Sequence, residues 1–199
     1  MDSEASIYGD HREGMEQCMA ELTDALLRVR SDFKAQEGAD PVDHILCRIK
    51  SEASMREKCH RLGLPENELS ALNIIKDAIG IRLVCPFISD VYHIRDAIAS
   101  LNDCEIVNEK DYIRYAKPNG YRSYHIILRY KSAWYVEIQL RTISMDTWAA
   151  LEHQLRYKKQ IGSNVELIYE ELKRCADELA STDITLHTIR DMIVSQEEG

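Results

Sequence analysis

The segment WYVEIQLRT carries a carboxylate, an amide and a guanidinium at every second position. If this segment is a strand, Glu137, Gln139 and Arg141 share one face and the apolar residues between them share the other. The apolar face can pack against a core, whereas the polar face is suited to a polar ligand. Taken alone, the pattern fits a half-solvated strand of an antiparallel sheet equally well.

The preceding segment NGYRSYHIILRY also has a strand-like composition, and it follows a Pro-Asn-Gly turn signal. Alternation would place Tyr121, Ser123 and His125 on one face, with Lys117 on the turn before them. A phenol ring beside two basic side chains suits a stacked nucleobase with its phosphates nearby. For each residue alone, an ordinary position on a sheet surface is the simpler interpretation.

Asp77 stands at the entry to DAIGIRLVCPF, whose β-branched run after Gly80 predicts a buried strand from which Arg82 projects. Asp77 and Glu137 are far apart in the sequence, so only the fold can bring them together. Two carboxylates beside nucleotide phosphates would form a Mg²⁺ site. The alternative is that Asp77 is a turn aspartate and Arg82 forms a surface salt bridge.

A basic cluster, RIKSEASMREK, lies further toward the N-terminus. Arg48 and Lys50 alternate as on a strand, and the hydroxyl of Ser54 and the ammonium of Lys58 follow at the entry to a helix. Helix N-termini and paired cations bind phosphate groups well. A charge run is more often a solvated face, and the cluster alone favours that interpretation.

The composition limits the class of protein. The 199 residues, 45% hydrophobic and 30% charged, are typical of one soluble domain with a real core. The net charge of −9 argues against a general nucleic-acid binder, so an anionic substrate would need a local basic pocket. No stretch reaches the roughly 20 apolar residues of a membrane span and the start is polar, so we expect a cytoplasmic protein without a membrane partner. The six scattered cysteines are expected to be reduced core thiols.

Periodicity predicts the elements that must position these groups. An amphipathic helix covers 14–36, and a strand or turn near the basic cluster leads into a helix that stops at Gly63. Another helix follows the buried strand, with Ser89 or Asp90 as its cap. The remaining expected elements are a strand CEIVNEKDYI, the two strands described above, a helix at 145–159, and a helix at 164–195 with a break near 181–183.

This order of elements predicts an α+β fold, a mixed β-sheet flanked by helices. The sequence shows no internal repeat and no linker, so we expect a single domain over 1–199. Its catalytic core would span 40–160, with N- and C-terminal helical extensions at 14–36 and 164–195.

Four ordered motifs together carry a family resemblance: DAIGIR, YIxxxKPNGYRSYH, VEIQLRT and MDxWAxLEHxxxYK. They resemble the synthetase domain of the RelA/SpoT family, in particular its short, single-domain small alarmone synthetases. The resemblance runs from about Arg48 to Lys158. It implies a nucleotidyltransferase-like sheet and a stringent-response (p)ppGpp synthetase. Such an enzyme transfers the β,γ-diphosphate of ATP to the ribose 3′-hydroxyl of GDP or GTP (or GMP) and releases AMP.

The resemblance also implies which residues bind ATP and metal. Two arginines would sandwich the adenine and the other residues would lie near the phosphates: Arg48 and Arg82, then Lys50, Ser54 and Lys58. Asp77 and Glu137 would hold Mg²⁺, and Glu137 would also be the base for the acceptor hydroxyl.

A second group of residues is implied at the acceptor guanine nucleotide. It comprises Lys110, Lys117, Tyr121, His125, Gln139 and Asp146. Tyr121 would stack on the guanine, and Lys117 and His125 would contact phosphates. The family often has Arg where this chain has Lys110, and a lysine gives up bidentate geometry, which could weaken GTP relative to GDP.

Two alternatives remain beside this reading. One is a pyrophosphokinase of the same fold that acts on adenosine nucleotides or a tRNA 3′ end, although the net charge disfavours tRNA. The other is a catalytically silent nucleotide or RNA sensor, which would be expected to lack one of Lys50, Asp77, Lys117 or Glu137. The resemblance also implies a homo-oligomer, a tetramer, since family members of this size are often homotetramers. The sequence makes no prediction about regulation by RNA or by the alarmone itself.

Overall fold

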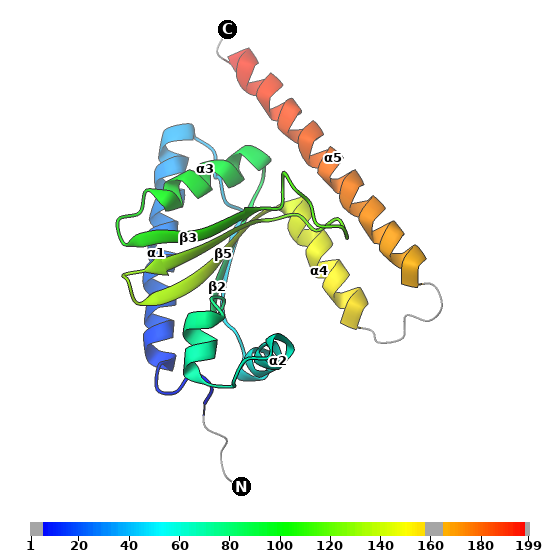
Figure 1. Ribbon diagram of the computed structural model, residues 1–199. Coiled ribbons are helices and arrows are strands. Elements are labelled where there is room, and N and C mark those ends of the chain that lie inside the picture. The colour runs from blue at the N-terminus through cyan, green and yellow to red at the C-terminus, as the bar shows by residue number, and fades with distance from the viewer. Residues whose placement is uncertain (1–5, 158–164, 198–199) are drawn as a thin grey trace.

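The strands form one mixed sheet in the computed structural model, which describes residues 6–157 and 165–197 (Figure 1). They are β1 (His44–Ile49), β2 (Ile79–Cys85), β3 (Cys104–Asp111), β4 (Tyr124–Tyr130) and β5 (Trp134–Thr142). Their spatial order is β1-β2-β5-β4-β3. The central pair β2–β5 is parallel, and the pairs β1–β2, β4–β5 and β3–β4 are antiparallel. The expected α+β fold with a mixed sheet is confirmed.

Helices flank this sheet. They are α1 (Arg12–Glu37), α2 (Glu52–Leu62), a short π-helical turn η1 (Ser70–Ile74), α3 (Ile88–Ala99), α4 (Ile143–Tyr157) and α5 (Val165–Glu197). The helices expected at 14–36 and 145–159 are confirmed, except that residues 158–159, with Lys158 of the fourth motif, lie outside the described part. Residue 164, the expected start of the last helix, also lies outside it. None of the described helices combines the length and apolarity needed to cross a membrane.

The hydrophobic core lies on the face of the sheet that α1 and α3 cover (Figure 1). Alternate residues of β2 and β5, such as Ile81 and Ile138, are at most 1% exposed and meet Leu22 of α1 and Ile94 of α3 in one cluster. Burying such side chains stabilises a fold by roughly 1.5–3 kcal/mol each. Because the apolar residues of the alternating pattern pack into this core, the polar residues between them face the opposite side of the sheet.

The start of α3 differs from the sequence-based expectation. The cap of α3 is Phe87, and Ser89 and Asp90 lie inside the first turn. Asp90 still accepts the backbone N–H of Phe87, at 3.3 Å, so a carboxylate satisfies a free donor from within the helix. It also pairs with Arg190 at 2.6 Å.

The break expected in the last helix is wrong, because α5 continues without interruption through 181–183. The Thr182 hydroxyl donates a hydrogen bond to the Glu178 carbonyl at 3.0 Å, within the helix, so it does not draw the backbone into a non-helical turn. Asp183 is 5% exposed and accepts a hydrogen bond from the Thr142 hydroxyl at the end of β5. The polar run therefore anchors α5 to the sheet.

The cysteine expectation holds in part. All six cysteines are free, and Cys18, Cys59 and Cys85 are buried. Cys47 and Cys175 are exposed, so they are not core thiols. Alternation explains Cys47, since it lies on the side of the edge strand β1 away from Leu46 and Arg48, where α1 only partly covers it.

Candidate active site

The open face of the sheet carries two rows of side chains that cross all five strands. The strand register places Arg48, Gly80, Glu137, Ile127 and Asn108 in the first row. The second row is Leu46, Arg82, Gln139, His125 and Lys110. Side chains opposite each other in neighbouring strands share a face. Seven polar side chains of these two rows therefore lie on one surface, and all of them except Asn108 were predicted site residues.

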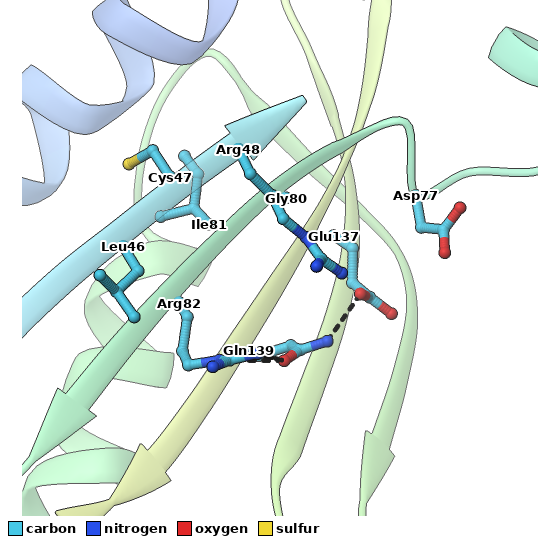
Figure 2. A pocket seen from close by; sticks show the side chains of 9 residues that line it. All are labelled: Leu46, Cys47, Arg48, Asp77, Gly80, Ile81, Arg82, Glu137 and Gln139. Atoms are coloured by element: carbon cyan, nitrogen blue, oxygen red, sulfur yellow. Dashed lines mark hydrogen bonds between the residues drawn. The ribbon is translucent and has the colours of Figure 1, made fainter. Parts of the chain in front are cut away.

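A pocket of about 250 Å³ opens over the β1–β2–β5 part of this face. Arg48, Arg82 and Asp77 line it together with Glu137, as Figure 2 shows. Gly80 has no side chain, and the Arg48 side chain lies over it: a Cβ at Gly80 would meet Arg48 atoms at 3.7–3.9 Å. Two guanidinium groups on either side of this opening can hold a planar ring, since arginine stacks on aromatic faces.

The role of Gly80 can be tested by filling the pocket. If this pocket holds ATP, as the resemblance implies, Gly80→Leu is expected to weaken ATP binding by roughly tenfold or more, because the new side chain takes the space between Arg48 and Glu137. Gly80→Ala is the matched control, since its Cβ makes only ordinary van der Waals contact. Titration of both variants with an ATP analogue measures the difference. Normal binding by Gly80→Leu would show that the nucleotide lies elsewhere.

Asp77 lies at one end of this pocket and is paired with two lysines. Its Oδ2 accepts hydrogen bonds from the ammonium groups of Lys50, which directly follows β1, and of Lys58 on α2, the latter at 2.5 Å. Burial lowers the pKa of Lys50, and Asp77 opposes that effect. Ser54, also expected here, lies one turn into α2 and donates its N–H to the N-cap Ser51. The two lysines therefore form a preorganised positive site that one carboxylate holds in place.

The chemistry of this end fits a divalent cation. Asp77 Oδ1 is buried and has no hydrogen-bond partner, which leaves its lone pairs available. Glu137 lines the same pocket as Asp77. Among the described residues no group of three or more His, Cys, Asp or Glu could hold a metal ion. One or two carboxylates completed by substrate phosphates are the usual protein site for Mg²⁺, and these two residues offer that set.

A second cavity, of about 540 Å³, lies over the β5–β4–β3 part of the same face. Its lining is basic and aromatic: Lys76, Lys110, Tyr112, Lys117 and His125. Glu137 lines this cavity as well as the first one. One carboxylate thus stands at the boundary between a pocket with two arginines and a pocket with three lysines.

Neighbouring side chains hold Glu137 in its charged form. His125 Nδ1 lies 3.4 Å from Glu137 Oε1, and the Gln139 amide donates to Oε2 at 2.8 Å. Burial by itself would raise the pKa of Glu137, but His125 and Gln139 prevail and lower it to about 2. The carboxylate is therefore ionised at any physiological pH.

A hydrogen-bonded network connects the two pockets beneath Glu137. Arg82 donates to Gln139 Oε1 at 3.2–3.3 Å and to Asp146 Oδ1 at 3.1 Å. Arg141, which is 4% exposed, donates to the same Asp146 oxygen and to the Tyr121 hydroxyl at 2.9 and 2.8 Å. Gln139 and Asp146 were expected in the acceptor nucleotide site, and Arg82 in the ATP site. The structure shows that both residues contact Arg82.

Tyr121 precedes β4, which begins at Tyr124, so the strand expected from about residue 120 starts later. Its hydroxyl and His125 Nε2 are 2.8 Å apart, which confirms that Tyr121 and His125 lie together. Ser123, by contrast, is fully buried and donates to the Leu140 carbonyl at 3.1 Å, so it does not share their face. The Lys117 ammonium lies over the Tyr121 ring, 4.7 Å from its centre.

Sequence reasoning missed part of the lining of both pockets. Gly80, which lines the first pocket, was read only as the boundary of a strand. Lys76 lies outside the alternating segments that drew attention, and Tyr112 was noted only as part of a strand and of a family motif, without a role of its own. Gly80 joins the row of Arg48 and Glu137 through the register of the strands, which cannot be read from the sequence.

Comparison with known proteins decides the family. Residues 47–162, more than half of the chain, match the family model described as a region found in RelA / SpoT proteins. The chain belongs to the RelA/SpoT family. The resemblance expected from the four motifs is therefore confirmed.

Individual members of the RelA/SpoT family support this assignment. GTP pyrophosphokinase YwaC of Bacillus subtilis is 37% identical over 157 residues, which cover 75% of this chain and 74% of YwaC. GTP pyrophosphokinase YjbM of the same organism is 30% identical over 181 residues, 87% of this chain and 84% of YjbM. The enzyme class expected from the sequence agrees with both names.

Solved RelA/SpoT-family structures share the fold. Small alarmone synthetase 1 of Bacillus subtilis, bound to its product pppGpp, superposes with a TM-score of 0.80 at 30% identity and covers 90% of this chain and 94% of its own. A GTP pyrophosphokinase family protein of Streptococcus pneumoniae gives 0.79 at 31% identity, with 90% of each chain covered. Their agreement with the whole sheet and its flanking helices confirms the expected architecture.

Proposed function

We propose that this RelA/SpoT-family protein is a (p)ppGpp synthetase that transfers the β,γ-diphosphate of ATP to the ribose 3′-hydroxyl of GDP or GTP and releases AMP. The observation that carries the proposal is the position of Glu137, which borders both the arginine-lined and the lysine-lined pocket. A transfer between two nucleotides needs two adjoining anion sites with one group at the point of transfer.

The first pocket suits ATP. Arg48 and Arg82 would hold the adenine, and Lys50 and Lys58 would turn from Asp77 to the phosphates as these arrive. Asp77 and Glu137 would hold Mg²⁺, which supplies charge neutralisation at the phosphate oxygens when bound. Once the lysines have turned to the bound phosphates, they and the arginines are in place before the transfer, so little reorganisation opposes the charge that develops during it.

The second pocket suits the acceptor nucleotide. Lys110 and Lys117, with Lys76 as an addition to the expected set, present positive charge for its 5′-phosphates. For guanine to stack on Tyr121, the Lys117 ammonium must leave the ring face, and a phosphate is the stronger partner that would draw it away. His125 fixes both the Tyr121 hydroxyl and Glu137, so it aligns the base site with the carboxylate.

Glu137 would take the proton of the attacking hydroxyl. Because its pKa is lowered to about 2, it is a weak base toward a neutral hydroxyl. In a loose phosphoryl-transfer transition state the proton leaves late, after the attacking oxygen has gained positive charge. A weak but permanently ionised carboxylate is sufficient for such a late transfer.

Product chromatography tests the proposal directly. ATP and Mg²⁺ with GDP, GTP, GMP or ADP as acceptor should yield AMP and a pyrophosphorylated guanine nucleotide, with ADP inactive. A product from ADP would favour an enzyme for adenosine nucleotides. No AMP release with any guanine acceptor would point to a silent nucleotide sensor and would overturn the proposal.

Tyr121→Ala is expected to raise the KM for GDP or GTP by roughly 5- to 150-fold, because stacking of a base on an aromatic ring contributes about 1–3 kcal/mol. The KM for ATP should change little. Tyr121→Phe is the matched control, since it keeps the ring and loses only the hydroxyl bonds to Arg141 and His125. Initial rates with each nucleotide varied in turn measure both constants. A loss confined to ATP would mean that the two sites are reversed.

We also propose that the chain forms a homo-oligomer, a tetramer, through α5. This helix exposes a run of large apolar side chains beyond its contacts with α3 and α4, comprising Ile184, Leu186, Ile189, Met192, Ile193 and Val194. Exposed apolar surface of this extent is typical of an interaction site. The single domain over 1–199, the catalytic core over 40–160 and the cytoplasmic location stay predictions, and the family match at 47–162 supports the bounds of the core.

A further inference from the structure

Residues before α1 are buried against the back of the ATP pocket. Ile7 is 2% exposed and Tyr8 is 1% exposed, although both lie close to the start of the chain. The Tyr8 hydroxyl donates a hydrogen bond of 2.7 Å to the backbone carbonyl of Lys50. Lys50 is one of the two lysines that pair with Asp77 at the proposed phosphate end of the pocket.

The same segment is tied to the start of α2. The Ser6 hydroxyl donates to Glu52 Oε1 at 2.8 Å, and the Ile7 N–H donates to Glu52 Oε2 at 3.3 Å. Glu52 is the first residue of α2, and the N-cap Ser51 lies between it and Lys50. Residues 6–8 therefore hold, from behind, both sides of the turn that leads from β1 into the helix.

The hydroxyl of Tyr8 is a permanent donor. Burial raises the pKa of Tyr8 to about 12, and the negative charges of Asp77 and Glu52 add to this effect. The proton therefore stays on the oxygen at any physiological pH.

We propose that Tyr8 is a positioning residue for the ATP-phosphate site, and that its hydroxyl sets the direction in which Lys50 and the N-terminus of α2 face the pocket; this inference rests on the proposed function. The Lys50 N–H is already bonded to the Ala78 carbonyl at 2.8 Å, and Tyr8 holds the carbonyl on the other side. With both peptide groups fixed, the Cα–Cβ bond of Lys50 has one orientation. Without the Tyr8 bond, the peptide between Lys50 and Ser51 can rotate.

Tyr8→Phe separates positioning from packing, because it keeps the buried ring and removes only the donor. Tyr130→Phe is the matched control: Tyr130 is 6% exposed and its hydroxyl bonds to Glu21 at 3.4 Å on the opposite side of the sheet. Both variants lose one partly buried hydroxyl, so general effects on folding should be similar. Thermal denaturation of the two proteins checks that they are.

The decisive measurement is calorimetric titration of each protein with AMPCPP plus Mg²⁺ and, separately, with GDP. Tyr8→Phe should weaken AMPCPP binding by about two- to tenfold, the effect of one net hydrogen bond, and leave GDP binding unchanged. Tyr130→Phe should change neither. Equal AMPCPP binding by wild type and Tyr8→Phe, or an equal loss for both nucleotides, would overturn the positioning role alone. Absence of AMPCPP binding to the wild type would instead overturn the proposed ATP pocket.

Discussion

Glu137→Gln is expected to lower kcat by on the order of 10³-fold while both nucleotides still bind. The amide is nearly isosteric and can keep its contact with Gln139, so the shape of both pockets should persist. It cannot accept a proton from the attacking hydroxyl, and it removes one of the two carboxylates that would hold Mg²⁺. Single-turnover release of AMP, together with titration of AMPCPP and GDP, separates chemistry from binding.

The control for this variant is Glu109→Gln on β3. Glu109 is 24% exposed, close to the 19% of Glu137, and it pairs with Arg95 at 2.6 Å. It lines neither pocket. Glu109→Gln should cost stability through its lost ion pair yet keep kcat. If Glu137→Gln turned over at a rate near that of Glu109→Gln, Glu137 would have no part in the transfer.

The pH profile adds a second test of Glu137. Since its pKa is lowered to about 2, the carboxylate stays ionised from about pH 4 upward, and the stability linked to its ionisation is lost progressively as pH falls from about 4.5 to about 2. Any fall in kcat between about pH 5 and 7 must then belong to another group. The profile of the wild type should therefore show no acid limb from Glu137 in that range.

Period-two alternation was sufficient to place the polar face of β5 correctly. The predicted segment WYVEIQLRT coincides with β5, and Glu137, Gln139 and Arg141 contact one another in sequence along it. The same rule misplaced Ser123, because the chain from Gly120 to Ser123 is a loop and does not alternate. Gly120 has a φ of 88°, which belongs to a turn and not to a strand.

Local sequence patterns could not predict that Asp77 and Glu137 line the same pocket. This arrangement depends on β5 inserting beside β2 in parallel, with Gly80 opposite Glu137. Parallel pairing of strands this far apart leaves no local sequence signature, so only the family resemblance pointed to it. The N-terminal segment was missed for a similar reason: Ile7 and Tyr8 precede the amphipathic pattern of α1, and their burial depends on α2.

Asp77→Asn is expected to abolish most turnover and to remove the benefit of Mg²⁺ for ATP binding. The substitution takes away a proposed Mg²⁺ ligand and also the counter-charge of Lys50 and Lys58. Two ammonium groups without that carboxylate attract a free polyanion more strongly. AMPCPP without Mg²⁺ should therefore bind Asp77→Asn at least as tightly as it binds the wild type, while kcat falls on the order of 10²- to 10³-fold.

The pH dependence of binding shows whether Asp77 also tunes Lys50. Burial lowers the pKa of Lys50 and the Asp77 hydrogen bond raises it, so Asp77→Asn should lower that pKa further. Since the charged form binds phosphate, metal-free AMPCPP affinity should decline at a lower pH in Asp77→Asn than in the wild type. Asp96→Asn, at an exposed residue paired with Arg95, is the matched control and should follow the wild type. If Mg²⁺ strengthened AMPCPP binding equally in Asp77→Asn and Asp96→Asn, Asp77 would serve only as the anchor of the two lysines.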